Sequence, residues 1–307
     1  MNSKIISEFN KLISNLLYEK PPNYSFKINS FRKFIDIVKS LDFEIKNIEQ
    51  IKNIKGIGKG TLDRIKEILD NGNLEENKTK NDCSQNEFNK LQSITGIGPS
   101  KAKQLVENNI TFDDLINNKN NILDNLTHHQ KLGLKYYYDV LKPIEHETII
   151  KVENYLNKFK FKFNICGSYR RKKNTSGDID VLIQKEDKSL QEIVDILTKK
   201  KFLVDHLTES GSTKYMGLCR IKNYHCMRID IRLISKKSYP FALLYFTGSK
   251  KTNTFMRNQA IKLGFKLNEY SLINTDTSNN SDSNIYLNSE EEIFKFLKLD
   301  YNKPQNR

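Results

Sequence analysis

Hydrophobic residues in the first part of the chain recur at the spacing of a helix face. Two series lie within residues 1–75: Ile5, Ile6, Phe9, Leu12, Ile13, Leu16 and Leu17, and then Phe31, Phe34, Ile35, Val38 and Leu41. Apolar side chains three and four positions apart share one side of a helix. We therefore predict helices here and again over residues 88–140. The polar stretch 75–87 between them is the best candidate for a linker.

From about residue 145 the pattern changes to a mixture of alternating and helical segments. It predicts strands at 163–168, 178–184, 214–221 and 228–234, and a helix at 189–200. A last unit runs from about residue 240 to the end and contains a polar loop at 274–283. The predicted fold class is α+β, with an all-helical N-terminal domain, a mixed or antiparallel sheet with helices, and a small C-terminal α+β subdomain.

One short motif occurs twice in the helical part. The run Ile54-Lys55-Gly56-Ile57-Gly58 resembles Ile94-Thr95-Gly96-Ile97-Gly98, and each is followed by a helix that carries Lys or Arg. Glycines permit a tight turn and bring the backbone amides of a helix N-terminus close to an anion. The repeat predicts two helix-hairpin-helix motifs that hold DNA phosphates, with contacts at Gly56, Gly58, Gly96 and Gly98.

Two aspartates lie one residue apart, after a loop rich in glycine, serine and arginine. Asp178 and Asp180 belong to the alternating run 178–183, so they share one face of a strand. Such close carboxylates repel each other unless a cation lies between them, and oxygen ligands favour Mg²⁺. The preceding run 167–177 offers amides, hydroxyls and guanidinium groups that hold phosphates. A solvated acidic strand end is the alternative, but metal-assisted phosphoryl or nucleotidyl transfer fits the whole run better.

A third carboxylate, Asp230, lies in a second alternating strand. Arg228, Asp230 and Arg232 occupy one face, and aliphatic residues occupy the other. The two arginines are expected to keep the pKa of Asp230 low, so that it stays ionised and ready for a metal. The alternative is a surface strand with cross-strand ion pairs. The Asp-x-Asp strand about fifty residues upstream favours the metal site.

The composition indicates that the expected partner is a polyanion. The chain has 307 residues, a net charge of +14 and a pI of about 9.3. Part of this charge reflects a sequence crowded with Asn, Lys and Ile, as A/T-rich codons produce, and such a composition is compatible with a viral source. Arginine is scarce, and its clustering is more informative: the motifs discussed here contain Arg170, Arg171, Arg228, Arg232 and Arg257.

The cysteines and the hydropathy pattern bear on the compartment. Cys83, Cys166, Cys219 and Cys226 form no Cys-x-x-Cys pair, and the adjacent His225 and Cys226 are poorly spaced for a zinc site with Cys219. Reduced, unligated thiols are expected. With no signal-peptide pattern or long apolar run, we expect a soluble intracellular protein of a reducing compartment, nuclear or cytoplasmic (including the cytoplasm of a virus-infected cell), with no membrane partner.

The last unit opens on an aromatic segment. Tyr245, Phe246 and Gly248 precede a helix on which Asn253 and Arg257, four residues apart, share a face. A stacked aromatic pair at a glycine turn, with Asn and Arg facing the same way, suits a sugar, a base and a template minor groove. An aromatic core with an exposed arginine remains open as the alternative.

Taken together, these runs resemble the family X DNA polymerases over nearly the whole chain. The resemblance includes both hairpins, the run 128–136 and the segments around Asp178, Asp230, Tyr245 and Tyr270. It implies a helical lyase-like domain at 1–78 and a DNA-binding helical subdomain at 79–142. A nucleotidyltransferase palm at 143–238 and a nucleotide-selection subdomain at 239–307 are implied to follow.

The resemblance also implies residue roles. Asp178, Asp180 and Asp230 would bind two Mg²⁺ ions, with Mn²⁺ as a possible substitute. The triphosphate would contact Ser168, Arg171, Ser176 and Gly177, the deoxyribose Tyr245, Phe246 and Gly248, and the minor groove Asn253 and Arg257. Further DNA contacts would come from Lys214, Arg228 and Tyr270. A monovalent cation, Na⁺ or K⁺, would bind the backbone carbonyls of each hairpin: Lys52, Ile54 and Ile57, and Gln92, Ile94 and Ile97.

One departure concerns the 5′-deoxyribose-phosphate lyase of the family. Arg64 stands where the family has its Schiff-base lysine, so lyase activity is left open, with Lys59 and Lys66 as substitute candidates. The expected function is template-directed, gap-filling DNA synthesis in base excision repair, on gapped or nicked DNA with dNTPs, by a monomer. The alternatives are a template-independent nucleotidyltransferase and a catalytically silent scaffold that binds gaps.

Overall fold

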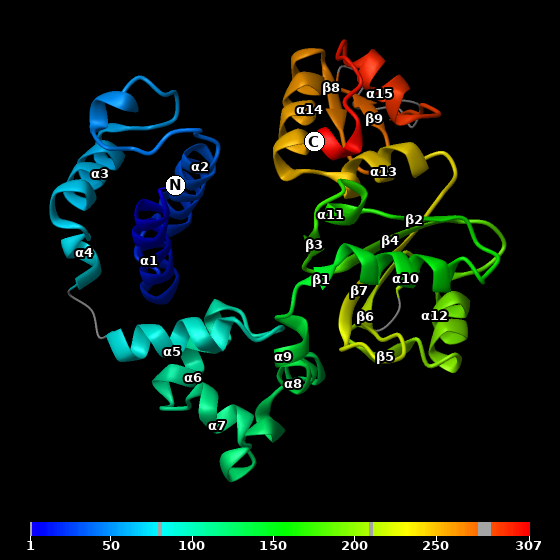
Figure 1. The fold of residues 1–307 in the computed structure, drawn as a ribbon, viewed down its shortest axis with the longest axis horizontal. Coiled ribbons are helices and arrows are strands. Elements are labelled where there is room, and N and C mark those ends of the chain that lie inside the picture. The colour runs from blue at the N-terminus through cyan, green and yellow to red at the C-terminus, as the bar shows by residue number, and fades with distance from the viewer. Residues whose placement is uncertain (1, 79–81, 209–210, 276–283) are drawn as a thin grey trace. The chain divides into compact units, whose positions relative to one another are not determined.

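The computed structural model describes residues 2–78, 82–208, 211–275 and 284–307. The chain divides into two compact units, residues 1–134 and 135–307. Each unit has its own hydrophobic core. In Figure 1 the first unit is coloured from blue to green and the second from green to red.

The first unit is helical throughout its described part, as the apolar spacing predicts. Its α-helices are α1 (Ser3–Glu19), α2 (Tyr24–Lys39), α3 (Lys59–Asn71), α4 (Glu75–Lys78), α5 (Asp82–Gln92), α6 (Pro99–Glu107), α7 (Phe112–Ile116) and α8 (His128–Lys135). Two 3₁₀ helices, η1 (Ile48–Gln50) and η2 (Lys119–Asn125), complete it. The predicted apolar faces of α1 and α2 meet in the core, where the ring of Phe9 lies 4.5 Å from that of Phe34.

The expected linker at 75–87 is largely helical instead. Helix α4 covers its start, α5 begins at Asp82, and residues 79–81 lie outside the described part. Tertiary contacts explain the difference, since the Asn77 side chain donates to the Glu8 carbonyl oxygen of α1 (3.1 Å). A polar composition therefore does not prevent this segment from folding onto α1.

The second unit combines a sheet with helices. Its first part contains α9 (Tyr137–Val140), β1 (Ile144–Glu145), α10 (His146–Leu156), β2 (Phe163–Ile165), α11 (Gly167–Arg170), β3 (Thr175–Ser176), β4 (Ile179–Gln184), α12 (Leu190–Lys199), β5 (Leu203–His206), β6 (Lys214–Cys219) and β7 (Met227–Ile234). Its last part contains α13 (Tyr239–Thr247), α14 (Lys250–Lys262), β8 (Phe265–Leu267), β9 (Leu272–Asn274), β10 (Asn284–Ile285), α15 (Glu290–Phe296) and the 3₁₀ helix η4 (Pro304–Asn306).

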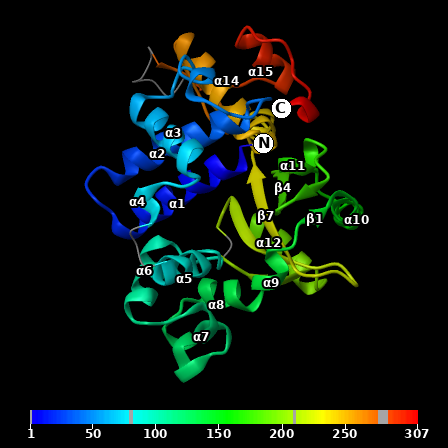
Figure 2. The same ribbon diagram turned by 60° about the vertical axis from the view of Figure 1, so that its left-hand side comes forward.

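The main sheet has five strands in the order β2-β4-β7-β6-β5. Strands β4 and β7 are parallel neighbours, and the other pairs are antiparallel (Figure 2). Separate small sheets join β1 to β3 and β8 to β9 and β10. The observed architecture confirms the predicted α+β class.

Alternation along β4 and β7 gives the sheet two different faces. Val181 and Ile231 belong to the core that also contains α10 and α12, so these helices cover one face. The opposite face carries Asp180 and Asp230, and α13 packs on it farther along at Leu182. Near Asp180 the second face is approached by Gly167, the first residue of α11.

The boundaries of the predicted strands and helix differ by only a few residues, with one exception. The strand expected at 163–168 ends at Ile165, and helix α11 begins at Gly167. Gly167 has a φ of +57°, a conformation that an extended strand does not use. Of the expected polar loop at 274–283, residues 276–283 lie outside the described part.

In the part of the chain that the structure describes, no helix has both the length and the apolar character that spanning a membrane requires.

Candidate active site

Asp180 and Asp230 lie directly opposite each other on neighbouring parallel strands. Their Cα atoms are register partners between β4 and β7, so both side chains emerge on the same face of the sheet. One oxygen of Asp230, Oδ1, is buried and has no hydrogen-bond partner among the described residues. A buried, unpaired carboxylate oxygen is costly, which marks the position as one that awaits a ligand.

The electrostatics of this pair differ from the sequence-based expectation. Burial and, after it, repulsion from Asp230 raise the pKa of Asp180 to about 6. Burial also raises the pKa of Asp230, although Arg228, Lys214 and Arg232 act in the opposite direction. The expectation that flanking arginines keep the pKa of Asp230 low is therefore wrong. Desolvation outweighs them, and a bound cation would relieve it.

Arg228 and Arg232, which flank Asp230, also contact other side chains. Arg228 forms an ion pair with Asp178, and the Arg232 guanidinium carbon lies 5.3 Å from the centre of the Phe246 ring. The described residues contain no group of three or more His, Cys, Asp or Glu side chains arranged to hold a metal. Asp180 and Asp230 nevertheless fit a divalent cation. They are two hard-oxygen donors that repel each other, one with an unpaired oxygen.

Helix α11 and the residues around it form the expected phosphate-binding side. An added Cβ at Gly167 would lie 2.5 Å from Asp180 Oδ2, so only glycine allows the loop to approach the carboxylate this closely. The Ser168 hydroxyl donates to Ser176 Oγ (2.7 Å), which joins two of the predicted phosphate contacts. Gly167 was not among the predicted site residues. Its position directly before Ser168 and close in sequence to the Asp-x-Asp run could have indicated that it belongs to the site.

Arg170 and Arg171 are adjacent but have different environments. Arg170 Nη1 and Nη2 donate to the two carboxylate oxygens of Glu290 (3.0 and 2.6 Å). Arg171 donates through Nη1 to the Thr247 carbonyl oxygen (2.6 Å), while its Nε is buried without a partner in the described part of the chain. Burial lowers the pKa of the Arg171 guanidinium, and attraction to the Asp180 carboxylate offsets this only in part. Arg171 is thus suited to bind an incoming anion.

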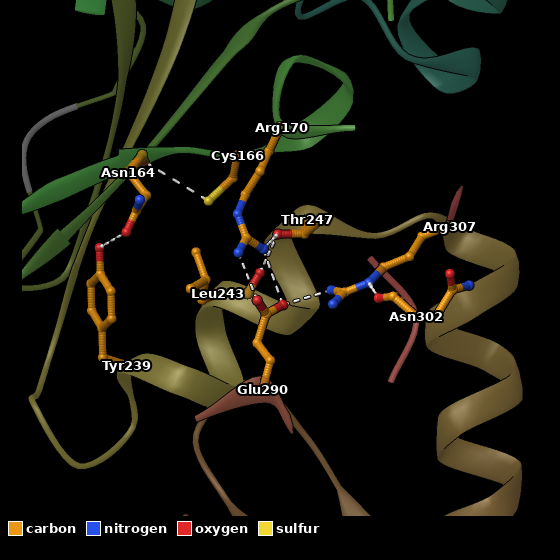
Figure 3. A network of polar contacts seen from close by, with 9 residues as sticks. All are labelled: Asn164, Cys166, Arg170, Tyr239, Leu243, Thr247, Glu290, Asn302 and Arg307. Atoms are coloured by element: carbon orange, nitrogen blue, oxygen red, sulfur yellow. Dashed lines mark hydrogen bonds and ion pairs between the residues drawn. The ribbon is translucent and has the colours of Figure 1, made fainter. Parts of the chain in front are cut away.

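Figure 3 shows the polar network that holds Arg170. Glu290, at the start of α15, is 4 % exposed and also accepts from Arg307 Nη1 (2.6 Å). Arg170 Nη1 donates in addition to the Thr247 hydroxyl (2.6 Å) on α13. Residues far apart in sequence therefore fix α11 against α13 and α15. Sequence reasoning missed Thr247, Glu290 and Arg307, because no local pattern links them.

The aromatic segment at the end of α13 lies beside these groups. The rings of Tyr245 and Phe246 are 5.1 Å apart and nearly perpendicular, at 85°, so they form a T-shaped pair and not the expected stack. Asn253 Nδ2 donates to the Tyr245 carbonyl oxygen (2.8 Å), and the Arg257 guanidinium carbon lies 5.0 Å from the centre of the Tyr245 ring. As predicted, Asn253 and Arg257 face the same way from α14. The peptide bond between Gly248 and Ser249 is cis.

A single cavity of about 610 Å³ brings most of the predicted residues together. It is lined by Ser168, Arg171, Asp178, Asp180, Tyr245, Phe246, Gly248, Asn253 and Arg257, and also by Gly167, Ser249, Lys250 and Thr254. Ser176 adjoins it through Ser168, and Asp230 through its partner Asp180. Ser249 and Thr254 were not predicted as site residues, although they border Gly248 and Asn253 in the sequence. The cavity combines two acidic groups with three cations, Arg171, Lys250 and Arg257, and is large enough for a nucleotide.

The remaining predicted residues are not among those that line this cavity. Lys214 begins β6 and is the register partner of Arg232 on β7. Tyr270 is 47 % exposed in the turn between β8 and β9. Lys59 and Lys66, the lyase candidates, are exposed on α3. The three buried cysteines, Cys166, Cys219 and Cys226, are free.

The two glycine motifs of the first unit build the same turn. The Ile57 amide donates to the Ile54 carbonyl oxygen (3.2 Å), and the Ile97 amide donates to that of Ile94 (3.0 Å). Gly56 and Gly96 have φ values of +102° and +89°, which glycine adopts readily. Gly58 and Gly98 are the N-caps of α3 and α6, and an added Cβ would meet nothing within 4 Å at either. Each helix N-terminus is open to an approaching phosphate.

Four family models match successive parts of the chain. A helix-hairpin-helix domain matches residues 1–74, and the fingers domain of DNA polymerase lambda matches 89–141. The DNA polymerase beta palm matches residues 143–236, and the DNA polymerase beta thumb matches 242–307.

The curated proteins that resemble this chain include two DNA polymerases lambda and a DNA nucleotidylexotransferase. DNA polymerase lambda of Arabidopsis thaliana is 29 % identical over 336 residues, covering 100 % of this chain and 62 % of the relative. DNA polymerase lambda of Rattus norvegicus is 30 % identical over 301 residues (90 % and 52 %), and DNA nucleotidylexotransferase of Xenopus laevis is 24 % identical over 326 residues (91 % and 63 %). The chain thus spans between about half and two thirds of the length of these relatives. With helix-hairpin-helix, fingers, palm and thumb domains in this order, the chain belongs to the family X DNA polymerases.

Proposed function

We propose that this chain is a DNA-directed DNA polymerase that adds dNTPs to the primer end in gapped or nicked DNA, as in base excision repair. The observation that carries the proposal is the in-register pair Asp180 and Asp230 beside a nucleotide-sized cavity. Two adjacent, half-buried carboxylates with raised pKa values favour a bound cation, and the cavity next to them presents cations for a triphosphate.

Asp180 and Asp230, joined by Asp178 once it leaves Arg228, would hold two Mg²⁺ ions, with Mn²⁺ as a substitute. The bound metal would lower the pKa of the primer 3′-hydroxyl and neutralise charge on the phosphates. Asp230 would orient that hydroxyl and offer its unpaired Oδ1 as a proton acceptor. The hydroxyl oxygen then attacks the α-phosphate, and pyrophosphate leaves.

The other lining residues would position the nucleotide. Arg171, Ser168, Ser176 and Gly177 would contact the triphosphate, with Arg171 offering its guanidinium Nε, which has no hydrogen-bond partner among the described residues. Tyr245, Phe246 and Gly248 would pack against the deoxyribose. Asn253 and Arg257 would face the minor groove, and Lys214, Arg228 and Tyr270 would contact the DNA.

The hairpins would hold the DNA backbone through the amides at Gly56, Gly58, Gly96 and Gly98. A carbonyl oxygen has two lone pairs, so those of Ile54 and Ile94 retain one for a Na⁺ or K⁺ ion after their turn hydrogen bond. Lys52 and Ile57, and Gln92 and Ile97, would supply the other carbonyl ligands. We propose that the protein acts as a monomer.

Primer extension with a substituted carboxylate tests the polymerase proposal. Asp230→Ala should lower single-turnover extension on gapped DNA with Mg²⁺ by at least about 10³-fold, because a ligand and proton acceptor of the reacting centre is lost. Binding of gapped DNA should change less than about twofold, since the hairpins are untouched. Asp195→Asn, at a position on α12 that is exposed, is the matched control and should extend normally.

The same assay separates the rival functions. Extension of a single-stranded primer as fast as of a gapped one would favour template-independent nucleotidyl transfer. Binding without extension by the native protein would indicate a silent scaffold. Extension by Asp230→Ala within tenfold of the native rate would refute the assignment of the carboxylates.

A further inference from the structure

A second hollow, of about 600 Å³, lies in the second unit outside the candidate active site. It forms where the segment after α12, the start of β5 and the turn between β6 and β7 meet the side of α10. Its lining includes Lys200, Lys201, Arg220, Lys222, Tyr155 and Tyr224, and none of its nine lining residues is acidic. All nine residues lie in the stretch matched by the DNA polymerase beta palm, and none of them lines the cavity of the candidate active site.

Backbone hydrogen bonds fix the segments that carry the cations. Lys201 adopts a left-handed conformation (φ 57°) after α12, and its amide donates to the Thr198 carbonyl oxygen (2.8 Å). The Arg220 amide donates to the Phe202 carbonyl oxygen (2.9 Å), which joins the two basic segments. The fold therefore brings four cations from two separate parts of the sequence to one place.

In the described part of the chain, these cations have no acidic partner. Among the described residues, no ion pair joins Lys200, Lys201, Arg220 or Lys222 to a carboxylate. Lysine is abundant throughout the chain, so Arg220 is the more informative member. The negative end of the α12 dipole accounts for lysines at its C-terminus but not for Arg220 and Lys222, which come from the turn between strands.

Aromatic side chains form the wall of the hollow. The Tyr155 ring stacks on Phe202 at 4.9 Å with an interplanar angle of 18°. The Tyr224 ring lies beneath Lys151, whose Nζ is 5.0 Å from the ring centre and donates to the Tyr224 hydroxyl. Cations next to aromatic surface are the combination with which proteins hold the phosphates and the apolar parts of a single nucleic-acid strand.

We propose that this hollow binds the phosphates of a single DNA strand, at a site separate from the DNA held at the carboxylates. An arginine fork, lysines and a tyrosine hydroxyl suit phosphodiester oxygens. Phe202 is only 1 % exposed and Lys158 Nζ lies 5.5 Å from the centre of the Tyr155 ring, so the parts of the tyrosine rings that line the hollow would contact a sugar. The site goes beyond the proposed polymerase function. The protein would then bind DNA at two sites, with the duplex at the carboxylates and a strand that leaves the duplex in this hollow.

The test uses the full chain with its gap-binding site saturated by unlabelled gapped duplex. Binding of a labelled dT12 oligonucleotide is measured by fluorescence anisotropy at several salt concentrations. The triple variant Lys200→Ala/Arg220→Ala/Lys222→Ala should bind dT12 at least about tenfold more weakly. With about 0.7 units of salt slope per phosphate contact on a single strand, its slope should fall by about 2.

A matched variant controls for the loss of net charge. Lys185→Ala/Lys188→Ala/Lys236→Ala removes three exposed cations from the same unit, away from the hollow, and should bind dT12 within about twofold of the native protein. Equal weakening in both triple variants would overturn the proposal. Displacement of dT12 by tripolyphosphate or polyglutamate at equal charge concentration would also overturn it, in favour of a free-phosphate or an acidic-peptide site.

A measurement on the native protein avoids any effect of substitution on folding. Acetylation by acetic anhydride, read by mass spectrometry, should be reduced by dT12 at Lys200, Lys201 and Lys222. It should be unchanged at Lys185 and Lys188. Equal protection at both sets of lysines, or none at the hollow, would contradict a strand-binding site there.

Discussion

Arg64 and Glu76 form a two-pronged ion pair in the helical unit. Arg64 Nε donates to Glu76 Oε1 (2.5 Å), and Nη2 donates to Oε2 (3.2 Å). Arg64 Nη1 also donates to the Gly60 carbonyl oxygen (2.9 Å), and its guanidinium carbon lies 5.4 Å from the centre of the Phe31 ring. The position at which the family resemblance places an amine nucleophile is thus occupied by a guanidinium that is held on several sides.

This pair predicts weak lyase activity. A guanidinium stays protonated and forms no Schiff base, and Lys59 and Lys66 are exposed, outside the kind of desolvated pocket that activates a lysine. Borohydride trapping on 5′-deoxyribose-phosphate DNA should therefore be weak for the native protein. Arg64→Lys should show a clear gain, and Arg64→Lys/Glu76→Gln a larger one, because Glu76 would otherwise favour the protonated amine.

The control for the lyase prediction removes the two substitute candidates. Strong trapping by the native protein that persists in Lys59→Ala/Lys66→Ala would show that the nucleophile lies elsewhere. A loss of trapping in that variant would instead show that one of these lysines has taken over the role.

The free space beside Gly58 and Gly98 predicts that the hairpins bind DNA through their backbone amides. Valine fits both positions by space and by φ (−92° and −84°), so Gly58→Val or Gly98→Val should leave the fold intact and obstruct the approaching phosphate. Each should weaken gapped-DNA binding about tenfold, equivalent to about 1.4 kcal/mol. Titrations at fixed salt with several flanking sequences check this. A strong dependence of affinity on sequence would mean that base contacts dominate.

The segment at Tyr245 predicts selection against ribonucleotides. Asn253 holds the Tyr245 carbonyl oxygen, and the backbone there would act as a steric wall against a 2′-hydroxyl. We expect kcat/KM for dCTP opposite G to exceed that for CTP by at least about 10²-fold, a difference of about 2.7 kcal/mol. Asn253→Ala should reduce this ratio, whereas Lys251→Ala, at an exposed position of α14, should preserve it. Comparable values for dCTP and CTP in the native protein would contradict the prediction.

Buried Glu8 predicts acid sensitivity of the helical unit. Burial acts to raise its pKa, but hydrogen bonds from Lys11, Asn77 and the Leu74 amide lower it overall. A lowered pKa in the folded state means that Glu8 stabilises the protein above about pH 4.3, its unfolded pKa, and that this contribution is lost as pH falls through the folded value.

Denaturant unfolding as a function of pH checks this prediction. Glu8→Gln should lower the free energy of unfolding at pH 7 by about 1–3 kcal/mol, because hydrogen bonds to a charged acceptor are lost. The difference from the native protein should shrink toward pH 3. Glu44→Gln, at an exposed position, should show no such difference. A deficit for Glu8→Gln that stays constant down to pH 3 would mean that the carboxylate charge is not responsible.

The sequence by itself determined the local chemistry of this protein. Alternation placed Asp178, Asp180 and Asp230 on strand faces, because successive side chains of a strand point to opposite sides. The repeated Gly-Ile-Gly placed two identical turns, since the positive φ of Gly56 and Gly96 is a local property of glycine. The helical spacing of apolar residues likewise predicted α1 and α2, whose buried faces match it.

Only the tertiary structure decided which of these groups meet and what their surroundings do to them. Burial raised the pKa of Asp230 against two neighbouring arginines, because desolvation depends on what covers a group and not on its neighbours in sequence. Packing of the second unit likewise brings Arg170 and Arg307 into contact with Glu290, and it brings together the cations around Arg220. Such contacts join residues that no local pattern relates, so packing of the whole unit had to bring them together.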